Sequence, residues 1–281
     1  MKRVLTVQDI SCVGRCSLTV ALPILSAMGL ETAILPTAVL STHTQFQGFT
    51  FRDLTGDLNA ILDHWKKEEF TFDTVYTGYL GSKEQIDIVV ALFEYYKKTG
   101  STLIADPAMA DNGKLYAGFD MEFVKEMKRV CAAADLILPN MTEAAMMLGI
   151  DYRADGYDED YVKDVLKRLC DMGAKTSVLT GVSFNDNELG AMAYDSEHDT
   201  FHAYFAEKLP VSYHGTGDCF ASAFSGGITR GLGLDGSLKI AADFIVESLK
   251  KTMADPERRF YGVNFEEALP LLMKQAGLFY E

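Results

Sequence analysis

The chain has 281 residues, with 26 Lys and Arg against 40 Asp and Glu, so its formal net charge is −14 at pH 7. Hydrophobic residues make up 48% of it and charged residues 23%, which is the composition of an ordinary globular protein. The acidic balance argues against nucleic acid or an anionic membrane as a partner, because both select for basic surfaces. A polyanion could still bind locally, through backbone amides and a metal ion.

The cysteines are odd in number and scattered, which argues against a disulfide framework and favours a reduced protein. They are Cys12, Cys16, Cys131, Cys170 and Cys219. Gln8 and Asp9 stop the first apolar run short of a signal-peptide core. The longest apolar stretch, residues 20–30, contains Pro23 and is far below the roughly 20 residues that span a bilayer. We therefore expect a soluble, cytoplasmic protein without a membrane partner.

Short β-rich runs alternate with longer amphipathic segments along the whole chain. Residues 53–67, for example, place Leu54, Leu58, Ile61 and Trp65 on one helical face. In chain order we expect a strand at 4–7, a helix at 17–28, a strand at 32–39, a helix at 53–67, a strand at 74–77, a helix at 83–98, a strand at 102–105 and a helix at 121–133. There follow a strand at 136–138, a helix at 159–172, a strand at 177–179, edge strands at 190–194 and 200–204, and a mostly helical last third.

This alternation predicts βαβ units, and hence an α/β fold with a mainly parallel central sheet and helices on both faces. No repeat, low-complexity tract or linker divides the chain. The acidic segment 151–160 is interpreted as a loop and a helix start. We therefore expect a single domain over residues 1–281.

In such sheets, ligands bind where the strands end at their carboxyl side. Nearly every predicted strand is followed there by polar residues or glycine, which predicts a site built from several loops. These strand ends are residues 8–11, 40–47, 78–81, 106–108, 139–143 and 180–181.

The segment Gly215, Thr216, Gly217, Asp218 runs directly into a predicted helix rich in small residues. Glycines at a helix start let backbone N–H groups point at an anion, and the helix dipole adds to the attraction. Asp218 could accept the proton of a hydroxyl that attacks phosphorus. Taken alone, the motif is better explained as a capped turn.

Two further strand ends carry groups suited to phosphate chemistry. Asn140 and Glu143 share one short turn after a predicted strand, and Asp106 precedes Pro107 after another. Carboxylate and amide oxygens suit nucleotide phosphates and a water-bridged Mg²⁺. Together with Asp218, they favour a functional interpretation of all three strand ends.

With these residues in place, the chain resembles the ribokinase-like superfamily, and within it the pyridoxal (vitamin B6) kinase branch. The resemblance covers nearly the whole chain in order. It rests on the segments 41–45 (STHTQ), 75–82 (VYTGYLGS), 103–108 (LIADPA), 138–143 (LPNMTE) and 211–220 (VSYHGTGDCF).

The resemblance implies phosphorylation of the 5′-hydroxymethyl group of pyridoxal, pyridoxine or pyridoxamine by MgATP. Asp218 would be the base, and the amides of Gly215, Thr216 and Gly217 would stabilise the transferring phosphoryl group. The nucleotide and its metal would be bound by residues at the other strand ends. Glu143 and Asp106 would hold Mg²⁺ largely through water, Asn140 would lie near the phosphates, and Thr180 and Gly181 would approach the nucleotide.

The resemblance also implies a pyridine pocket lined by His43, Thr44, Gln45 and Tyr79. After the first strand, either Asp9, where many pyridoxal kinases have Ser, or Ser11 would contact the ring, and Asp9 could alter the vitamer preference. Thr42 and Leu40 also differ from the family pattern. A homodimer is expected on the resemblance alone, and a monovalent cation is an optional further cofactor.

Two alternatives remain. The first is a hydroxymethylpyrimidine kinase or a sugar kinase of the same superfamily. Hydroxymethylpyrimidine kinases commonly read G-T-G-C at the catalytic turn; here Asp218 holds that place and Cys219 follows it, which favours the pyridoxal kinase assignment over a hydroxymethylpyrimidine kinase. The second alternative is a non-catalytic B6 or nucleotide carrier. The intact Asp218, Glu143 and 215–217 argue against it, since a carrier needs no base.

Overall fold

The computed structural model describes residues 1–278, which form alternating strands and helices. The first half comprises β1 (Arg3–Ser11), α1 (Leu18–Ala27), β2 (Glu31–Leu40), β3 (Phe51–Asp53), α2 (Thr55–Lys67), β4 (Thr74–Thr77), α3 (Lys83–Lys98), β5 (Thr102–Ala105), β6 (Ala110–Asp111), β7 (Lys114–Leu115) and α4 (Met121–Ala133). The second half comprises β8 (Leu136–Ile137), α5 (Met141–Leu148), α6 (Glu159–Cys170), β9 (Thr176–Val182), β10 (Glu188–Asp195), β11 (Thr200–Glu207), α7 (Thr216–Arg230), α8 (Gly233–Ala254), a 3₁₀ turn (Phe265–Ala268) and α9 (Leu269–Gln275).

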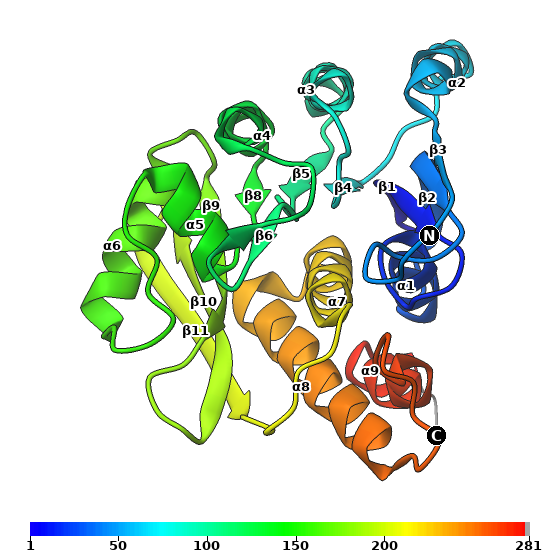
Figure 1. Ribbon diagram of the computed structural model, residues 1–281. Helices are drawn as coiled ribbons and strands as arrows, with labels where there is room; N and C mark the ends of the chain where they lie inside the picture. The colour runs from blue at the N-terminus through cyan, green and yellow to red at the C-terminus, as the bar shows by residue number, and fades with distance from the viewer. Residues whose placement is uncertain (279–281) are drawn as a thin grey trace.

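Nine strands form one sheet in the order β11-β10-β9-β8-β5-β4-β1-β2-β3, and β6 and β7 form a separate hairpin (Figure 1). The strands from β2 to β9 in this order pair in parallel. The flanking strands β3, β10 and β11 pair antiparallel with their neighbours. The predicted α/β fold with a mainly parallel sheet is therefore confirmed.

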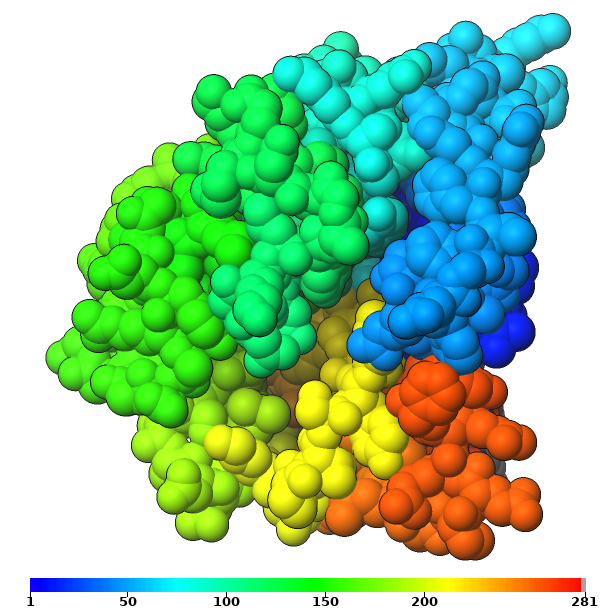
Figure 2. Space-filling model, in the orientation of Figure 1, coloured from blue at the N-terminus to red at the C-terminus, as the bar shows by residue number. Residues whose placement is uncertain are grey.

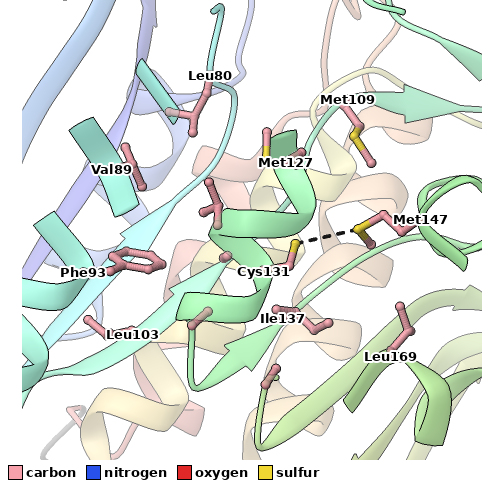
Figure 3. Close-up of a cluster of buried hydrophobic side chains, with 14 of the residues drawn as sticks. Leu80, Val89, Phe93, Leu103, Met109, Met127, Cys131, Ile137, Met147 and Leu169 are labelled. Carbon is pink, nitrogen blue, oxygen red and sulfur yellow. Dashed lines mark hydrogen bonds between the residues drawn. The ribbon is translucent and has the colours of Figure 1, made fainter. Parts of the chain in front are cut away.

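Successive residues of a strand point to opposite faces of the sheet, so both faces carry apolar side chains. Helices cover both faces and bury these side chains. In β1, Leu5 and Val7 pack with α2 to α6, whereas Val4 packs with α1, α7, α8 and α9. Figure 3 shows part of the core between the sheet and helices α2 to α6, where the thiol of Cys131 lies 3.7 Å from the sulfur of Met147. Within residues 1–278, no helix combines the length and the apolar character needed to cross a bilayer.

The expected elements are present, with three additions and one change. Strand β3 was not predicted, because three exposed residues carry no pattern. The β6–β7 hairpin and helix α5 were also not predicted, since the turn expected at 139–143 is in fact the start of α5. Of the two expected edge strands, β11 lies at the edge, whereas β10 is paired on both sides.

Gly190 in β10 provides a test of this packing. A Cβ added there would lie 2.0 Å from the carbonyl oxygen of Tyr204 on β11, so Gly190→Ala must displace a backbone strand. We expect it to lower the free energy of unfolding by roughly 1–3 kcal/mol. Gly56→Ala is the control, because a Cβ at that exposed site in α2 meets nothing within 4 Å and should change stability by less than about 1 kcal/mol. Urea unfolding of both variants measures this, and equal effects would contradict the close approach.

Candidate active site

The carboxyl ends of the parallel strands open into a cavity of about 310 Å³. The surface is hollowed here between the green segment around residues 105–120 and the yellow segment around residue 212 (Figure 2). All the residues predicted for catalysis, nucleotide binding and metal binding line this cavity. They are Asp106, Asn140, Glu143, Thr180, Gly181, Gly215, Thr216, Gly217 and Asp218.

The N-terminus of α7 forms one wall of the cavity. Gly215 precedes the helix with φ 82°, and a Cβ there would lie 2.1 Å from the carbonyl oxygen of Arg15, so only glycine fits. Among the described residues, nothing accepts a hydrogen bond from the N–H groups of Thr216, Gly217 or Asp218. These first N–H groups have no partner inside the helix and are available to an anion.

Asp218 connects two helix starts. Its Oδ2 accepts a hydrogen bond of 3.0 Å from the backbone N–H of Ser17, the residue before α1. Burial raises the pKa of Asp218 to about 6, the Ser17 hydrogen bond opposes this rise, and the nearby carboxylate of Asp9 adds to it. A carboxyl group that titrates near neutral pH is suited to accept a proton.

Asn140 and Glu143 begin α5 and also hold the β6–β7 hairpin. Each side chain caps the backbone N–H of the other, at 3.0 Å and 2.9 Å. Glu143 also accepts from the N–H of Met109 at 2.9 Å, and Asn140 donates to the carbonyl of Ala110 at 2.8 Å. The two residues therefore have a structural role as well as their place in the cavity.

The cavity lining is strongly acidic. It contains the carboxylates of Asp106, Asp111, Glu143, Glu207 and Asp218, and none of the lining residues is Lys or Arg. Burial raises the pKa of Glu143 to about 7, and burial with the charges of Glu143 and Asp218 raises that of Asp106 well above its usual value. A polyphosphate can bind here only if cations accompany it.

The donor set fits a hydrated Mg²⁺, which prefers oxygen ligands and keeps several waters. Asp106 and Glu143 lie at one rim with raised pKa values, as expected for carboxylates that lack a countercharge. Within residues 1–278, no three His, Cys, Asp or Glu side chains are gathered as a ready-made metal cage. A metal would therefore bind through water and phosphate oxygens rather than through protein ligands alone.

An apolar wall, which was not predicted from the sequence, completes the cavity. It comes from β10, the segment after β11 and α8, and it comprises Leu189, Leu209, Val211, Ala242, Ile245, Val246 and Leu249. The i, i+3, i+4 spacing in α8 predicts a buried face, but a core and a ligand pocket share that signal. A flat apolar surface beside the phosphate-type groups suits a nucleobase.

The residues predicted for the pyridine pocket lie beside this cavity and do not line it. His43 packs against His214, a lining residue, with ring centroids 4.4 Å apart and the rings tilted by 43°. Its Nδ1 accepts from the N–H of Gln45 at 3.2 Å, so Nε2 carries the proton and donates to the carbonyl of Tyr261 at 3.1 Å. Burial and His214 lower the pKa of His43, and the imidazole is neutral.

The other predicted pocket residues differ in exposure. Asp9 is 4% exposed, and its Oδ2 accepts from the hydroxyl of Ser11 at 2.9 Å. Burial raises the pKa of Asp9, and within residues 1–278 no Lys or Arg pairs with it. Tyr79 stacks on Phe119 with centroids 5.5 Å apart. Thr44 and Gln45 are exposed.

The raised pKa of Asp218 predicts a pH-dependent stability. A carboxyl whose folded pKa is above its unfolded value stabilises the fold below the unfolded pKa, and this contribution is lost as the pH rises through the folded pKa. Compared with Asp218→Asn, the wild type should lose roughly 2–3 kcal/mol of unfolding free energy between about pH 4 and pH 7. Urea unfolding without divalent metal measures this, with Asp186→Asn at an exposed turn as the control. Parallel pH curves for wild type and Asp218→Asn would contradict it.

Comparison with known proteins places these features in a family. A family model described as phosphomethylpyrimidine kinase matches residues 27–260. A pyridoxal kinase from Dictyostelium discoideum is 27% identical over 283 aligned residues, which cover 92% of this chain and 91% of the relative.

Solved structures agree with this match. A candidate phosphomethylpyrimidine kinase from Bacteroides thetaiotaomicron, crystallised with pyridoxal, is 40% identical with a TM-score of 0.91, over 96% of this chain and 95% of that one. The pyridoxal kinase from Lactobacillus plantarum is 31% identical with a TM-score of 0.88, over 100% of both chains. The chain therefore belongs to the phosphomethylpyrimidine kinase family, a group of kinases of ribokinase-like fold that includes pyridoxal kinases.

Proposed function

We propose that this chain is an ATP-dependent kinase that phosphorylates the 5′-hydroxymethyl group of pyridoxal, pyridoxine or pyridoxamine. The observation that carries the proposal is the position of Asp218. Its carboxylate lies beside the free N–H groups of α7, in a cavity suited to a nucleotide and next to a separate buried polar group around Asp9. The relatives named as pyridoxal kinases, and the one crystallised with pyridoxal, support a B6 substrate.

In the proposed reaction, the substrate hydroxyl oxygen attacks the γ-phosphorus of ATP and the bond from that phosphorus to the ADP oxygen breaks. Asp218 accepts the hydroxyl proton, for which a pKa of about 6 is well matched. The amides of Gly215, Thr216 and Gly217 donate to the oxygens of the transferring group. These donors are already oriented by the helix start, so little reorganisation is needed during transfer.

The remaining predicted residues bind the nucleotide and its metal. Asp106 and Glu143 would hold Mg²⁺ largely through water, and the ion would supply the positive charge that the cavity lining lacks. Asn140 would lie near the phosphates, and Thr180 and Gly181 would approach the nucleotide. The apolar wall formed by β10, the segment after β11 and α8 would receive the base.

On the substrate side, His43, Thr44, Gln45 and Tyr79 would line the pyridine pocket, with Asp9 or Ser11 facing the ring. The neutral imidazole of His43 presents no charge that would repel a protonated substrate. The contact of His43 with His214 would connect this pocket to the phosphate cavity. The two substrates would therefore meet at Asp218.

A hydroxymethylpyrimidine kinase is the second candidate, because the matching family model is described by that activity. Asp218 in place of the cysteine common in those enzymes favours the B6 substrate. We further propose a single domain, because no linker divides the chain, and a cytoplasmic location, because the cysteines suggest a reduced protein. A homodimer and a monovalent cation as an optional cofactor rest on the family resemblance alone.

A turnover panel tests the proposed function. ADP release should depend on MgATP together with pyridoxal, pyridoxine or pyridoxamine, and should be lower with hydroxymethylpyrimidine. Asp218→Asn should lower kcat by roughly 10²- to 10⁴-fold, because it removes the proton acceptor. Circular dichroism and urea unfolding would verify that this variant is folded. Turnover with hydroxymethylpyrimidine alone would favour the second candidate, and nucleotide or vitamer binding without any ADP release would favour a carrier.

Asp9 should determine how the enzyme discriminates among vitamers. It is a buried carboxylate that, within residues 1–278, pairs with no Lys or Arg, and pyridoxamine carries an ammonium group that pyridoxal and pyridoxine lack. Asp9→Asn should therefore lower kcat/KM for pyridoxamine at least roughly ten-fold more than for pyridoxal, the size of a charge-assisted hydrogen bond. Ser11→Ala is the control and should affect the vitamers more evenly. An equal loss for all vitamers in Asp9→Asn would show that the charge does not select the substrate.

A further inference from the structure

Ser17, the residue before α1, has a backbone conformation that residues with a side chain rarely adopt. Its φ is 52° and its ψ is −134°, which is the mirror image of an extended conformation. Glycine populates this region readily, whereas a Cβ makes it strained. Ser17 is also buried, at 6% exposed. Strain of this kind persists only where the surrounding structure holds it, and it is concentrated at functional sites.

Arg15 fixes the loop in which Ser17 lies. Its carbonyl oxygen lies against the start of α7, so closely that a Cβ on Gly215 would approach it to 2.1 Å. Its guanidinium pairs with Glu266 at 3.1 Å and also bonds to the side chain of Asn264. The loop is therefore held between the start of α7 and the segment after α8, and these contacts keep the strain at Ser17 from relaxing.

Both polar ends of Ser17 bond to buried carboxylates. Serine before a helix ordinarily accepts a hydrogen bond from an N–H of the first turn, but within the described chain the Ser17 side chain does not cap α1. Its hydroxyl bonds instead to the carboxylate of Asp9, and its backbone N–H donates to Asp218 at 3.0 Å. The charge of Asp9 also raises the pKa of Asp218, so the two carboxylates lie near each other. One residue thus links the carboxylate near the end of β1 to the predicted base.

We propose that Ser17 is a positioning residue that sets the distance between Asp9, which would face the vitamer ring, and Asp218, which would accept the hydroxyl proton. The strained backbone makes this possible, because it turns the hydroxyl toward Asp9 on β1 while the N–H faces Asp218 on α7. The two donors also offset the repulsion between the carboxylates. A ring bound at Asp9 then presents its hydroxymethyl group to Asp218 in a fixed geometry.

The kinetic part of this inference rests on the proposed kinase function, whereas the strain does not. Without the Ser17 hydroxyl, Asp9 and the ring bound to it would shift relative to Asp218. A shift of a fraction of an ångström between base and hydroxyl lowers kcat. The KM for ATP should stay nearly unchanged, since Ser17 is not among the described residues that line the cavity proposed for the nucleotide. Relief of the strain should affect stability alone.

A comparison of Ser17→Gly with Ser17→Ala tests the strain. Both variants lose the hydroxyl, so the difference between their urea midpoints reports the effect of the Cβ. Glycine is the better replacement for serine at ordinary helix starts as well, so Ser82 is the control, because it precedes α3 with φ −155° and caps it. We expect the midpoint of Ser17→Gly to exceed that of Ser17→Ala by roughly twice the gap between the same variants of Ser82. Equal gaps would show that Ser17 is not strained and would overturn the structural basis of the proposal.

Steady-state kinetics test the link between Asp9 and Asp218. Ser17→Ala should lower kcat roughly ten-fold and leave the KM for ATP within two-fold of wild type. Ser17→Gly should lower kcat by a similar factor although it is the more stable of the two, so the loss cannot be ascribed to instability. Ser11→Ala removes the other hydroxyl bonded to Asp9, on the same strand. It should raise the KM for the vitamer and change kcat much less.

Two kinetic results would overturn the proposal. One is wild-type kcat in both Ser17 variants, because the hydroxyl would then not position the base. The other is an equal loss of kcat in Ser11→Ala and Ser17→Ala, because the effect would then come from Asp9 alone. Failure of the proposed function looks different, since the wild type itself would then turn over none of the vitamers and the kinetic part of the inference would fail with it. The midpoint gaps would still decide whether Ser17 is strained.

Discussion

The hydrogen bond between the carboxylate of Asp218 and the N–H of Ser17 joins the starts of two helices that are 200 residues apart in the chain. Helix α1 begins directly after Ser17, and Asp218 lies in the first turn of α7, so the positive ends of two helix dipoles meet at one carboxylate. This arrangement offsets part of the cost of burying the charge. It also sets where the N–H groups of α7 point, and hence where an anion can bind.

The cavity, too, has no Lys or Arg side chain to balance its carboxylates. The chain has fewer basic than acidic residues, and none of the basic ones lines the cavity. Backbone N–H groups and helix ends provide the positive potential that Lys or Arg supplies in many phosphate sites, and under the proposed function a hydrated metal would add to it. The net charge argues against extended polyanions as partners but is compatible with a nucleotide.

The sequence predicted most of the parallel sheet and the set of loops that surround the cavity, because strand and helix periodicities are strong in buried βαβ units. It did not predict α5, whose first turn looks like a loop until Asn140 and Glu143 are recognised as a capping box. The apolar wall was missed for another reason. Leu249 and its neighbours look like core residues in sequence, and only the fold shows that part of this face is open.

The residues predicted for a pyridine pocket illustrate a different limit, because contacts between distant segments leave no local pattern. His43 was expected from its motif, but its neutral state depends on burial and on His214, and its tautomer depends on Gln45 and on the carbonyl of Tyr261. Exposure of Thr44 and Gln45 likewise could not be deduced from the residues alone. Asp9 stood out in the sequence only as a departure from the family pattern. Only the structure shows that, among the described residues, no Lys or Arg pairs with Asp9 and that His214 is the basic group nearby.

The hydrogen bond between His43 and the carbonyl of Tyr261 shows which part of the chain orients the imidazole. The family match ends at residue 260, one residue before the carbonyl that receives the imidazole proton. Phe46 packs on Phe260 and Tyr261 at the same place, with centroids 5.2 Å and 5.7 Å apart. A chain that ended at residue 260 would lack this carbonyl, so the imidazole would lose its acceptor, and it would also lack Phe265 and Leu272, which are buried in the core. The segment after residue 260 therefore fixes both the imidazole of His43 and part of the core beneath it.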